Sequence, residues 1–494
     1  MKSQPNFDNL VIPAVLKGIL TFIFFLAGFS YSEAQTAADK KAILQSIENK
    51  HQQYAEVAKK IWSYAELGFH EFKSTALLQQ ELKNAGFSIK AGVADMPTSF
   101  IAEYGSGKPV IGMLAEYDAL PGLSQDTVAE RRAIKVGAPG HGCGHNLLGT
   151  GALAAAIAVK DWLKSSGTKG TIRLYGTPAE EGGSGKVYMV RAGLFEDVDA
   201  VVRWHPGDKN SAESGSNLAF ISGKFRFHGI AAHASGAPER GRSALDGVEA
   251  MDNMVNMMRE HVPSTTRIHY VITKGGEAPN VVPAFAEVFY YVRNPDRLTV
   301  KETWDRVVKA SEGAALGTGT TVDHEIISGM FNVLPNETLS KIVDKNLRIT
   351  GGLNYSELDK AYALKIQESF TQKPPLEQSR EIQPFKTGTL GTSSSDSGDI
   401  SWVVPTGYLR AASAVPGTAS HTWQVVAAGG MEIGIKGMLV AAKTLALSAC
   451  ELYKSPGALA EAKAEIIKRR GVDFKYEALL GNRKPAIDYL DIPE

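Results

Sequence analysis

Three short apolar runs in the first half of the chain each end in acidic or imidazole side chains. Ile111 to Glu116 runs into an acidic turn, Thr171 to Gly176 runs into a Glu-Glu pair, and Asp199 to Trp204 ends at His205. Their length and apolar content predict buried strands. The Ala-rich stretch Leu147 to Leu163 has the length of a crossover helix, so we expect a parallel sheet with a site at its carboxyl edge.

The middle of the chain alternates differently and predicts a separate unit. Its apolar positions give the order βαββαβ, which is that of a ferredoxin-like sandwich, with strands at 217–228, 267–273, 284–292 and 320–327 and helices at 243–262 and 300–315. Helical patterns return at 334–349 and 431–453. We therefore expect an α/β catalytic domain in two parts, 35–215 and 329–494, with an inserted domain at 216–328.

The segment His141 to Asn146 carries the first candidate chemistry. Cys143 and His145 lie two residues apart between glycines, and a thiolate with an imidazole suits a divalent transition metal. Alone, the segment fits a tight turn with a chance Cys equally well. The predicted sheet edge strengthens the metal hypothesis because it would bring Glu180 and Glu181 to the same place.

At this point the chain resembles the aminoacylase and carboxypeptidase G superfamily of co-catalytic metallopeptidases. Within it the chain is similar to the amidohydrolase branch, and there to the p-aminobenzoyl-glutamate hydrolases. The matching blocks occur in the family's order, at 115–123, 140–150, 178–183, 204–206, 229–234, 279–283 and 420–423. The resemblance implies a mixed-sheet, phosphorylase/hydrolase-like catalytic domain, with the insert as a lid that also makes a homodimer.

The resemblance also implies a dinuclear site that holds two divalent ions, zinc or manganese. Its ligands would be Cys143, His145, Glu181, His205 and His421. Glu180 would be the general base that takes a proton from a metal-activated water. The Gly182-Gly183 pair after the two Glu residues would let the chain turn both carboxylates into one cavity.

Further residues take their roles from the same resemblance. His233 in the insert would stabilise the oxyanion, in its own site or in that of the partner subunit. Asn280 and Arg293 would contact substrate, although an Arg on a strand can equally be a solvated edge residue. The polar loop 391–399 resembles one that lines the family's pocket, and it fits a surface turn as well.

The chain departs from the wider superfamily at two places. Glu116-Tyr117-Asp118 replaces a His-x-Asp metal motif, so His145 is expected to substitute for the missing ligand and Asp118 to orient a ligand His. Asn146 stands where auxin-conjugate hydrolases of the branch carry Asp. This weakens an auxin-conjugate function and favours the aminobenzoyl-glutamate type.

The leading hypothesis is a metal-dependent amidohydrolase that cleaves N-acyl or aminobenzoyl amino acids. One alternative is a related exopeptidase or dipeptidase acting on a short peptide. Another is a noncatalytic metal-binding or regulatory subunit, because hydrolases of this type can occur as paired subunits. The presence of Glu180 with all five presumed ligands argues against the latter.

Composition limits the other possibilities. Lys plus Arg and Asp plus Glu are both 53, so there is no net field to attract nucleic acid. An apolar run at 18–29, followed by a small-x-small cleavage site near Ala34, predicts a signal peptide over 1–34 and export to the periplasm or the medium. No stable membrane span is expected after cleavage, although an uncleaved anchor stays open. Cys143 and Cys450 are the two cysteines, and we expect both to be free.

Overall fold

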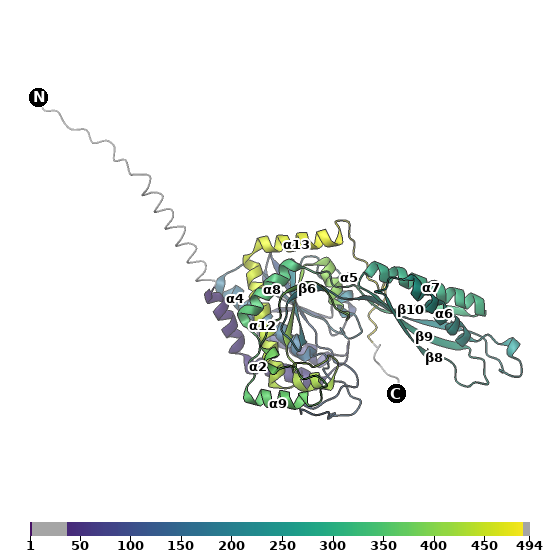
Figure 1. Ribbon diagram of the computed structural model, residues 1–494. Helices are drawn as coiled ribbons and strands as arrows, with labels where there is room; N and C mark the ends of the chain where they lie inside the picture. Colours follow the sequence, from purple (N-terminus) through teal and green to yellow (C-terminus); the bar gives the residue numbers. More distant parts are fainter. Residues whose placement is uncertain (2–36, 488–494) are drawn as a thin grey trace.

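The computed structural model describes Met1 and residues 37–487. The predicted signal peptide, 1–34, lies outside this part except for Met1. Figure 1 shows a larger body, which corresponds to the predicted catalytic domain (the catalytic body), and a long lid that projects from it and is built from the middle of the chain. This arrangement confirms the predicted α/β fold with an inserted βαββαβ domain.

A six-stranded mixed sheet forms the centre of the catalytic body. Its strands lie in the order β1-β2-β4-β3-β5-β12, with bounds Ser88–Ala91 (β1), Phe100–Ser106 (β2), Val110–Ala115 (β3), Gly170–Gly176 (β4), Ala200–Gly207 (β5) and Thr406–Ala412 (β12). Strands β4, β3, β5 and β12 are parallel, whereas β2 and β1 add an antiparallel edge. The three strands predicted from the first half of the chain are therefore neighbours with a shared carboxyl edge.

Helices cover both faces of this sheet, which explains why β3 is buried along its whole length. Ile111 and Met113 face the larger core on one side of the sheet, whereas Leu114 faces the smaller core on the other side. Residues 37–48 are also helical. The further α-helices of the catalytic body are His51–Tyr64 (α2), Phe72–Asn84 (α3), His145–Ser166 (α4), Gly185–Arg191 (α5), Glu337–Thr350 (α8), Glu357–Gln367 (α9), Ser397–Val403 (α10), Trp423–Gly429 (α11), Glu432–Lys454 (α12) and Pro456–Arg470 (α13).

Helix α12 is apolar and long enough to cross a membrane, and it is the one such helix in the described residues. Of its most apolar window, 89% is buried inside the protein, where α12 packs on α4, α8 and the sheet. Its length and apolar composition are therefore explained by its place in the protein core. Cys450 is a buried residue of this helix, and Cys143 and Cys450 are both free, as predicted.

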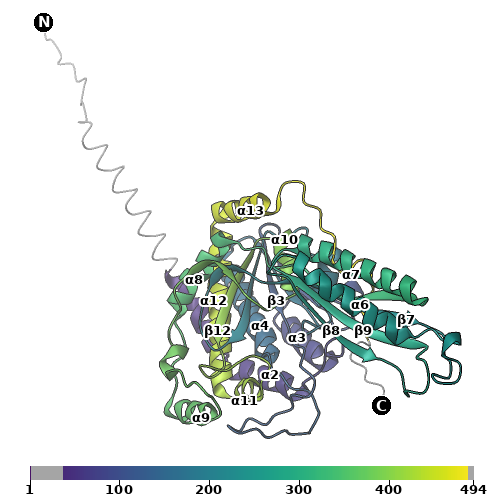
Figure 2. The ribbon, with the colours of Figure 1, turned by 45° about the vertical axis from the view of Figure 1, so that its right-hand side comes forward.

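The lid is a four-stranded antiparallel sheet with two helices on one face (Figure 2). Its elements follow the predicted order, with bounds Ala219–His228 (β7), Ala244–Met258 (α6), Arg267–Lys274 (β8), Phe285–Asn294 (β9), Arg297–Thr318 (α7) and Thr321–Met330 (β10). The strand order β10-β7-β9-β8 leaves β8 at an edge. A two-stranded sheet, Glu213–Ser216 (β6) with Lys386–Leu390 (β11), lies where the lid joins the body.

Candidate metal centre and catalytic cavity

A cavity of about 510 Å³ opens at the carboxyl ends of the parallel strands. Cys143, Glu181, His205 and His421, all predicted ligands, line it together with Glu180. The polar loop after β11 contributes Ser393, Ser394 and Ser395, as the sequence suggested. The structure thus brings together residues that are up to 278 positions apart, since Cys143 and His421 share this cavity.

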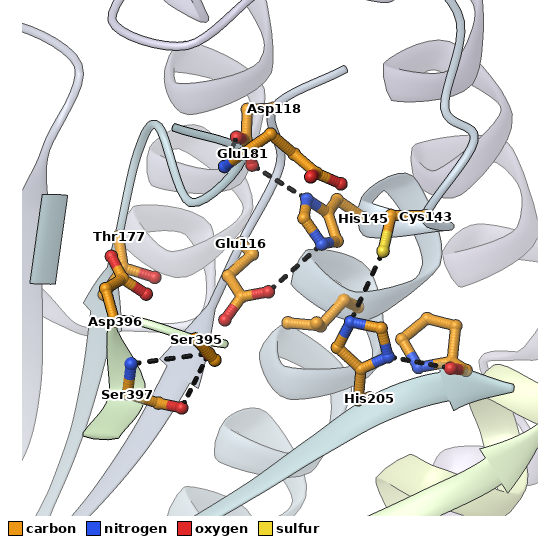
Figure 3. A network of polar contacts seen from close by, with 12 residues as sticks. Glu116, Asp118, Cys143, His145, Thr177, Glu181, His205, Ser395, Asp396 and Ser397 are labelled. Carbon is orange, nitrogen blue, oxygen red and sulfur yellow. Dashed lines mark hydrogen bonds and ion pairs between the residues drawn. The ribbon is translucent and has the colours of Figure 1, made fainter. Parts of the chain in front are cut away.

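His145 begins α4 behind the cavity and lies between two carboxylates (Figure 3). Its Nδ1 is 2.8 Å from Asp118 Oδ1, and its Nε2 is 3.2 Å from Glu116 Oε2. The second oxygen of Asp118 accepts the backbone N–H of Glu181 at 2.8 Å. Although burial opposes protonation, the Asp118 carboxylate raises the pKa of His145 well above its usual range. These contacts fit the predicted role of Asp118 in orienting a ligand histidine.

Cys143 faces His205 across the mouth of the site, with Sγ 3.4 Å from Nε2 (Figure 3). His205 Nδ1 is 2.8 Å from the carbonyl oxygen of Pro206, so its N–H can donate there and leave Nε2 toward the cavity. Burial and the Glu181 carboxylate oppose ionisation of the thiol, but the imidazoles of His205 and His145 lower the pKa of Cys143 to about 6. This shift favours the thiolate, which is the form that binds metals.

The Glu-Glu pair lies on a turn with an unusual backbone. Ala179 adopts a φ of 55°, and its N–H donates to Glu71 Oε1 at 2.8 Å, which anchors the turn from beneath. Gly182 follows with a φ of 136°, a value that L side chains rarely adopt. Glu180 and Glu181 consequently line one cavity, as the glycine pair predicted.

The two carboxyl groups have different environments. Burial, with the negative charges of Glu116 and Glu181, raises the pKa of Glu180 well above its usual range. For Glu181 burial acts in the same direction, but the neighbouring imidazole of His421 and the charge of His145 lower its pKa. A pair whose pKa values move apart divides naturally into a proton carrier and an ionised ligand.

His421 reaches the site from the loop between β12 and α11. Its backbone has a φ of 60°, and its N–H donates to the carbonyl of Gly142 at 2.9 Å. Its Nε2 lies 3.4 Å from Glu181 Oε1. A positive φ at a histidine costs conformational energy, and here it holds the imidazole beside a second candidate ligand.

The donor set fits metal ions. Three groups have ligand atoms within 4.8 Å of one another: Cys143 with His145 and His205, Cys143 with Glu181 and His421, and Glu116 with His145 and Glu180. Cys143 belongs to two of them, so one thiolate could serve two ions. In the described part of the chain, buried Glu116 Oε2, His145 Nε2 and Glu181 Oε1 have no hydrogen-bond partner. Although His145 Nε2 and Glu116 Oε2 are 3.2 Å apart, they do not form a hydrogen bond. Buried polar atoms are normally paired, so these donors are well suited to a cation.

A buried lysine lies on the far side of Glu116, and no pattern in the sequence indicated it. Lys186 of α5 places Nζ 2.8 Å from Glu116 Oε1 and 2.7 Å from Asp396 Oδ1. Its own N–H donates to Asp396 Oδ2 at 2.9 Å. Although burial opposes ionisation, first the Lys186 ammonium and then His145 hold the pKa of Glu116 well below its usual range. Lys186 thus keeps Glu116 negative beside the candidate metal centre.

Three predicted site residues lie apart from this cavity in the single chain. Strand β7 leaves the body at Leu218, whose N–H donates to Ser393, and His233 follows the strand's far end on an exposed loop. Exposed Asn280 lies beside it, where its carbonyl accepts the N–H of Ala234. Arg293 lines an adjoining cavity of about 360 Å³, and its Nη1 is 3.4 Å from Ser394 Oγ. The roles of these three residues stay predictions.

Comparisons with known proteins give the family. The model of "Peptidase family M20/M25/M40" matches residues 112–362. The chain belongs to this family. It is also 42% identical over 447 residues to a subunit of the p-aminobenzoyl-glutamate hydrolase of Escherichia coli strain K12, a match covering 85% of this chain and 93% of that subunit. The predicted superfamily and branch are thereby confirmed.

This M20 family member is also similar to two further proteins. The mouse Xaa-Arg dipeptidase is 28% identical over 449 residues, covering 88% of this chain and 93% of the dipeptidase. A Bacillus subtilis crystal structure, described as a dinuclear metal binding peptidase from the M20 family, has a TM-score of 0.55 at 17% identity and covers 82% of this chain and 99% of its own. The family and the match to the E. coli hydrolase establish a hydrolytic enzyme that acts on amide bonds, and the crystal structure supports the fold.

Proposed function

We propose that the protein is a metal-dependent amidohydrolase that releases an amino acid from an N-acyl or aminobenzoyl conjugate, with p-aminobenzoyl-glutamate as the first substrate to test. The observation that carries the proposal is the placement of Glu180 in one cavity with four candidate ligands. The similarity to a p-aminobenzoyl-glutamate hydrolase subunit over 93% of its length supports the substrate class.

Two divalent ions, zinc or manganese, are proposed to bind Cys143, His145, Glu181, His205 and His421. Sulfur and imidazole donors favour zinc by their softness, whereas the carboxylate also suits manganese. When bound, such ions supply a water of lowered pKa and polarise the amide carbonyl. The shared thiolate and the unpaired buried oxygen of Glu181 support this ligand set.

The remaining chemistry is assigned to side chains of the chain. Glu180 accepts the proton of the attacking water and returns it to the leaving amine. Its buried position beside Glu116 and Glu181 favours the protonated form between these two steps. Asp118 contributes indirectly, since it fixes the His145 ring and the backbone of Glu181.

A second protomer is proposed to complete the site. His233 is exposed at the outer end of the lid, where it could reach the cavity of a partner and stabilise the oxyanion. The edge strand β8 exposes Val271 and Ile272, which are 56% and 40% accessible, and an unpaired apolar edge favours strand pairing. A homodimer is our first proposal, and pairing with a related subunit is the alternative suggested by the name of the E. coli relative.

Export is a further proposal, and it rests on the sequence of residues 1–34 alone. The apolar run and the small residues Ser32 and Ala34 support cleavage by a signal peptidase. Edman sequencing of the mature protein from a cell fraction tests this directly. A mature N-terminus near residue 35 in the periplasm or the medium is expected, and an intact N-terminus would contradict it.

Two other functions remain candidates. A dipeptidase is favoured by the similarity to the Xaa-Arg dipeptidase over 88% of this chain. A noncatalytic metal-binding subunit is the second, and the complete set of Glu180 and five candidate ligands disfavours it. A substrate panel separates both from the leading proposal.

The deciding experiment uses the mature protein, stripped of metal and reloaded with zinc or manganese. Hydrolysis of p-aminobenzoyl-glutamate is followed beside N-acyl amino acids and dipeptides, including an Xaa-Arg dipeptide. Glu180→Gln is the catalytic variant, and Arg469→Gln, which removes one partner of an exposed ion pair on α13, is the matched control. Metal-dependent turnover lost only in Glu180→Gln is expected. Metal binding without turnover of any substrate would sink the proposal and revive the noncatalytic subunit.

A further inference from the structure

Two arginines enter the catalytic cavity from neighbouring strands. In the parallel pair β5–β12, Arg203 lies opposite Tyr408 and His205 lies opposite Arg410. Residues two apart on a strand point to the same face of the sheet, and all four of these side chains line the cavity. The arginines therefore continue the surface on which His205, a candidate metal ligand, is placed.

The two guanidinium groups are joined by one aromatic ring. Arg203 Cζ lies 4.5 Å from the centre of the Tyr408 ring, a cation–π contact. Arg410 Nε lies 3.4 Å from the hydroxyl oxygen of Tyr408. Tyr408 thus fixes both side chains from the same wall, which reduces the conformational entropy that a ligand must remove.

In the described part of the chain, neither arginine forms an ion pair with a carboxylate. Within residues 37–487 no carboxylate oxygen lies within 4.0 Å of either guanidinium, although Arg203 is only 7% accessible. The negative charges of Glu213, which lines the same cavity, and of Asp208 attract the Arg410 guanidinium from beyond this distance. The Glu213 carboxylate accepts the hydroxyl of Thr389 at 3.0 Å. A buried guanidinium without a counter-ion is costly, so this wall is suited to an anion.

We propose that Arg203 and Arg410, held by Tyr408, form a subsite for a carboxylate of the substrate beside the metal centre. The inference rests on the proposed function and narrows its substrate class to conjugates whose amino acid has a free carboxylate facing this wall. If that group is the side-chain carboxylate, the preferred conjugates are those of acidic amino acids. A planar guanidinium can grip a carboxylate through two N–H donors. If the side chain of the amino acid faces this wall, the two arginines repel a cationic group there.

The substrate carboxylate has two possible sources in a glutamate conjugate, the α-carboxylate and the side chain. The test therefore uses p-aminobenzoyl-glutamate, its side-chain amide p-aminobenzoyl-glutamine, and its α-amide p-aminobenzoyl-isoglutamine. These three ligands have nearly the same shape, so the charge is the main difference. For the metal-loaded protein we expect kcat/KM to fall about 10- to 100-fold when the bound carboxylate becomes an amide.

Arg203→Met and Arg410→Met keep the apolar stems and remove the charges. Each should lower kcat/KM for the diacid by about 10- to 100-fold. For the amide that lacks the recognised carboxylate, each variant should change kcat/KM by less than about threefold. Which of the two amides behaves in this way shows whether the α-carboxylate or the side-chain carboxylate is bound. Arg469→Met, a surface substitution on α13, is the charge-matched control. An equal loss on all three substrates, or no loss, would overturn the subsite.

Binding gives a readout that does not depend on turnover. Calorimetry with the metal-loaded Glu180→Gln protein measures the three ligands with and without the Arg410→Met substitution. Preferential binding of the diacid, lost with Arg410→Met, supports the subsite even if no ligand is hydrolysed, whereas absence of hydrolysis by the wild type would refute the proposed function alone. If a Met variant does not fold by circular dichroism, Arg203→Lys and Arg410→Lys replace it, and retention of full diacid preference would contradict the two-donor grip.

Discussion

Replacement of Lys186 by Met should destabilise the catalytic body strongly. The ammonium group is fully buried and lies 2.7 Å from Asp396 and 2.8 Å from Glu116. The substitution retains much of the side-chain volume and removes the charge. It therefore leaves two carboxylates buried without their shared counter-ion, while the surrounding packing changes little.

The expected magnitude follows from these distances. At an effective dielectric constant of about 20, each contact contributes an attraction of about 6 kcal/mol. Much of this is cancelled because burial removes the hydration of all three charges. Removal of one partner of a buried ion pair typically costs about 3–5 kcal/mol, since the remaining charge stays uncompensated. We expect Lys186→Met to lower the free energy of unfolding by that amount.

Urea unfolding, followed by circular dichroism in the presence of a chelator, measures this cost without a contribution from metal release. Lys345→Met is the matched control, because Lys345 makes an exposed pair with Glu451 at 2.8 Å and such pairs contribute at most about 1 kcal/mol. The double variant Lys186→Met with Asp396→Asn should recover part of the loss. Equal, small losses in Lys186→Met and Lys345→Met would refute the reasoning.

Three further predictions concern charge, metal binding and packing. Burial raises the pKa of Asp399 to about 7, above its unfolded value of about 4. The folded protein therefore binds the extra proton and loses stability as the pH rises from about 4 to about 7. In urea unfolding, Asp399→Asn should remove a slope of up to about 1.4 kcal/mol per pH unit from the free energy of unfolding, and parallel stability profiles of the variant and the wild type would contradict this. Cobalt-loaded protein should show near-ultraviolet thiolate-to-metal absorption that Cys143→Ser abolishes, whereas an unchanged spectrum would remove Cys143 from the ligand set. A Cβ at Gly437 would lie 2.0 Å from the carbonyl oxygen of Ala412, so Gly437→Ala should lower the free energy of unfolding by about 1–3 kcal/mol, measured by thermal unfolding. Gly457→Ala is the control, because no atom lies within 4 Å of the new Cβ, and it should be neutral or stabilising by up to about 1 kcal/mol.

Local pattern predicted the parts of the fold that depend on neighbours in sequence. Strands β3, β4 and β5 are short apolar runs, and their parallel pairing follows from the crossover helix α4. The lid elements also lie close to their predicted bounds, because their burial alternates with the period of each element. Convergence of Cys143 and Glu181 followed from the shared carboxyl edge.

The missed residues depend on contacts between distant segments. In the sequence Lys186 resembles an ordinary surface lysine, because its ion-pair partners Glu116 and Asp396 lie 70 and 210 residues away. A signal for Arg203 was present, because it lies two residues before His205 on a strand and must share its face. Its partner on β12 could be found only from the register of the two strands.

The pairing of β5 with β12 also has a consequence for the order in which the chain folds. Val201 pairs with Thr406 across the whole inserted lid, so a growing chain completes the lid before the edge of β5 is covered. Strand pairs in the lid span at most 110 positions, from Phe220 to Met330, whereas Val201 and Thr406 are 205 positions apart. Closure of the central sheet therefore requires a longer loop and should be the slower step. Until then β5 presents an open edge that favours aggregation. Arg410 and His421 lie in or after this last strand, so the proposed site cannot assemble before residue 421 has been synthesised.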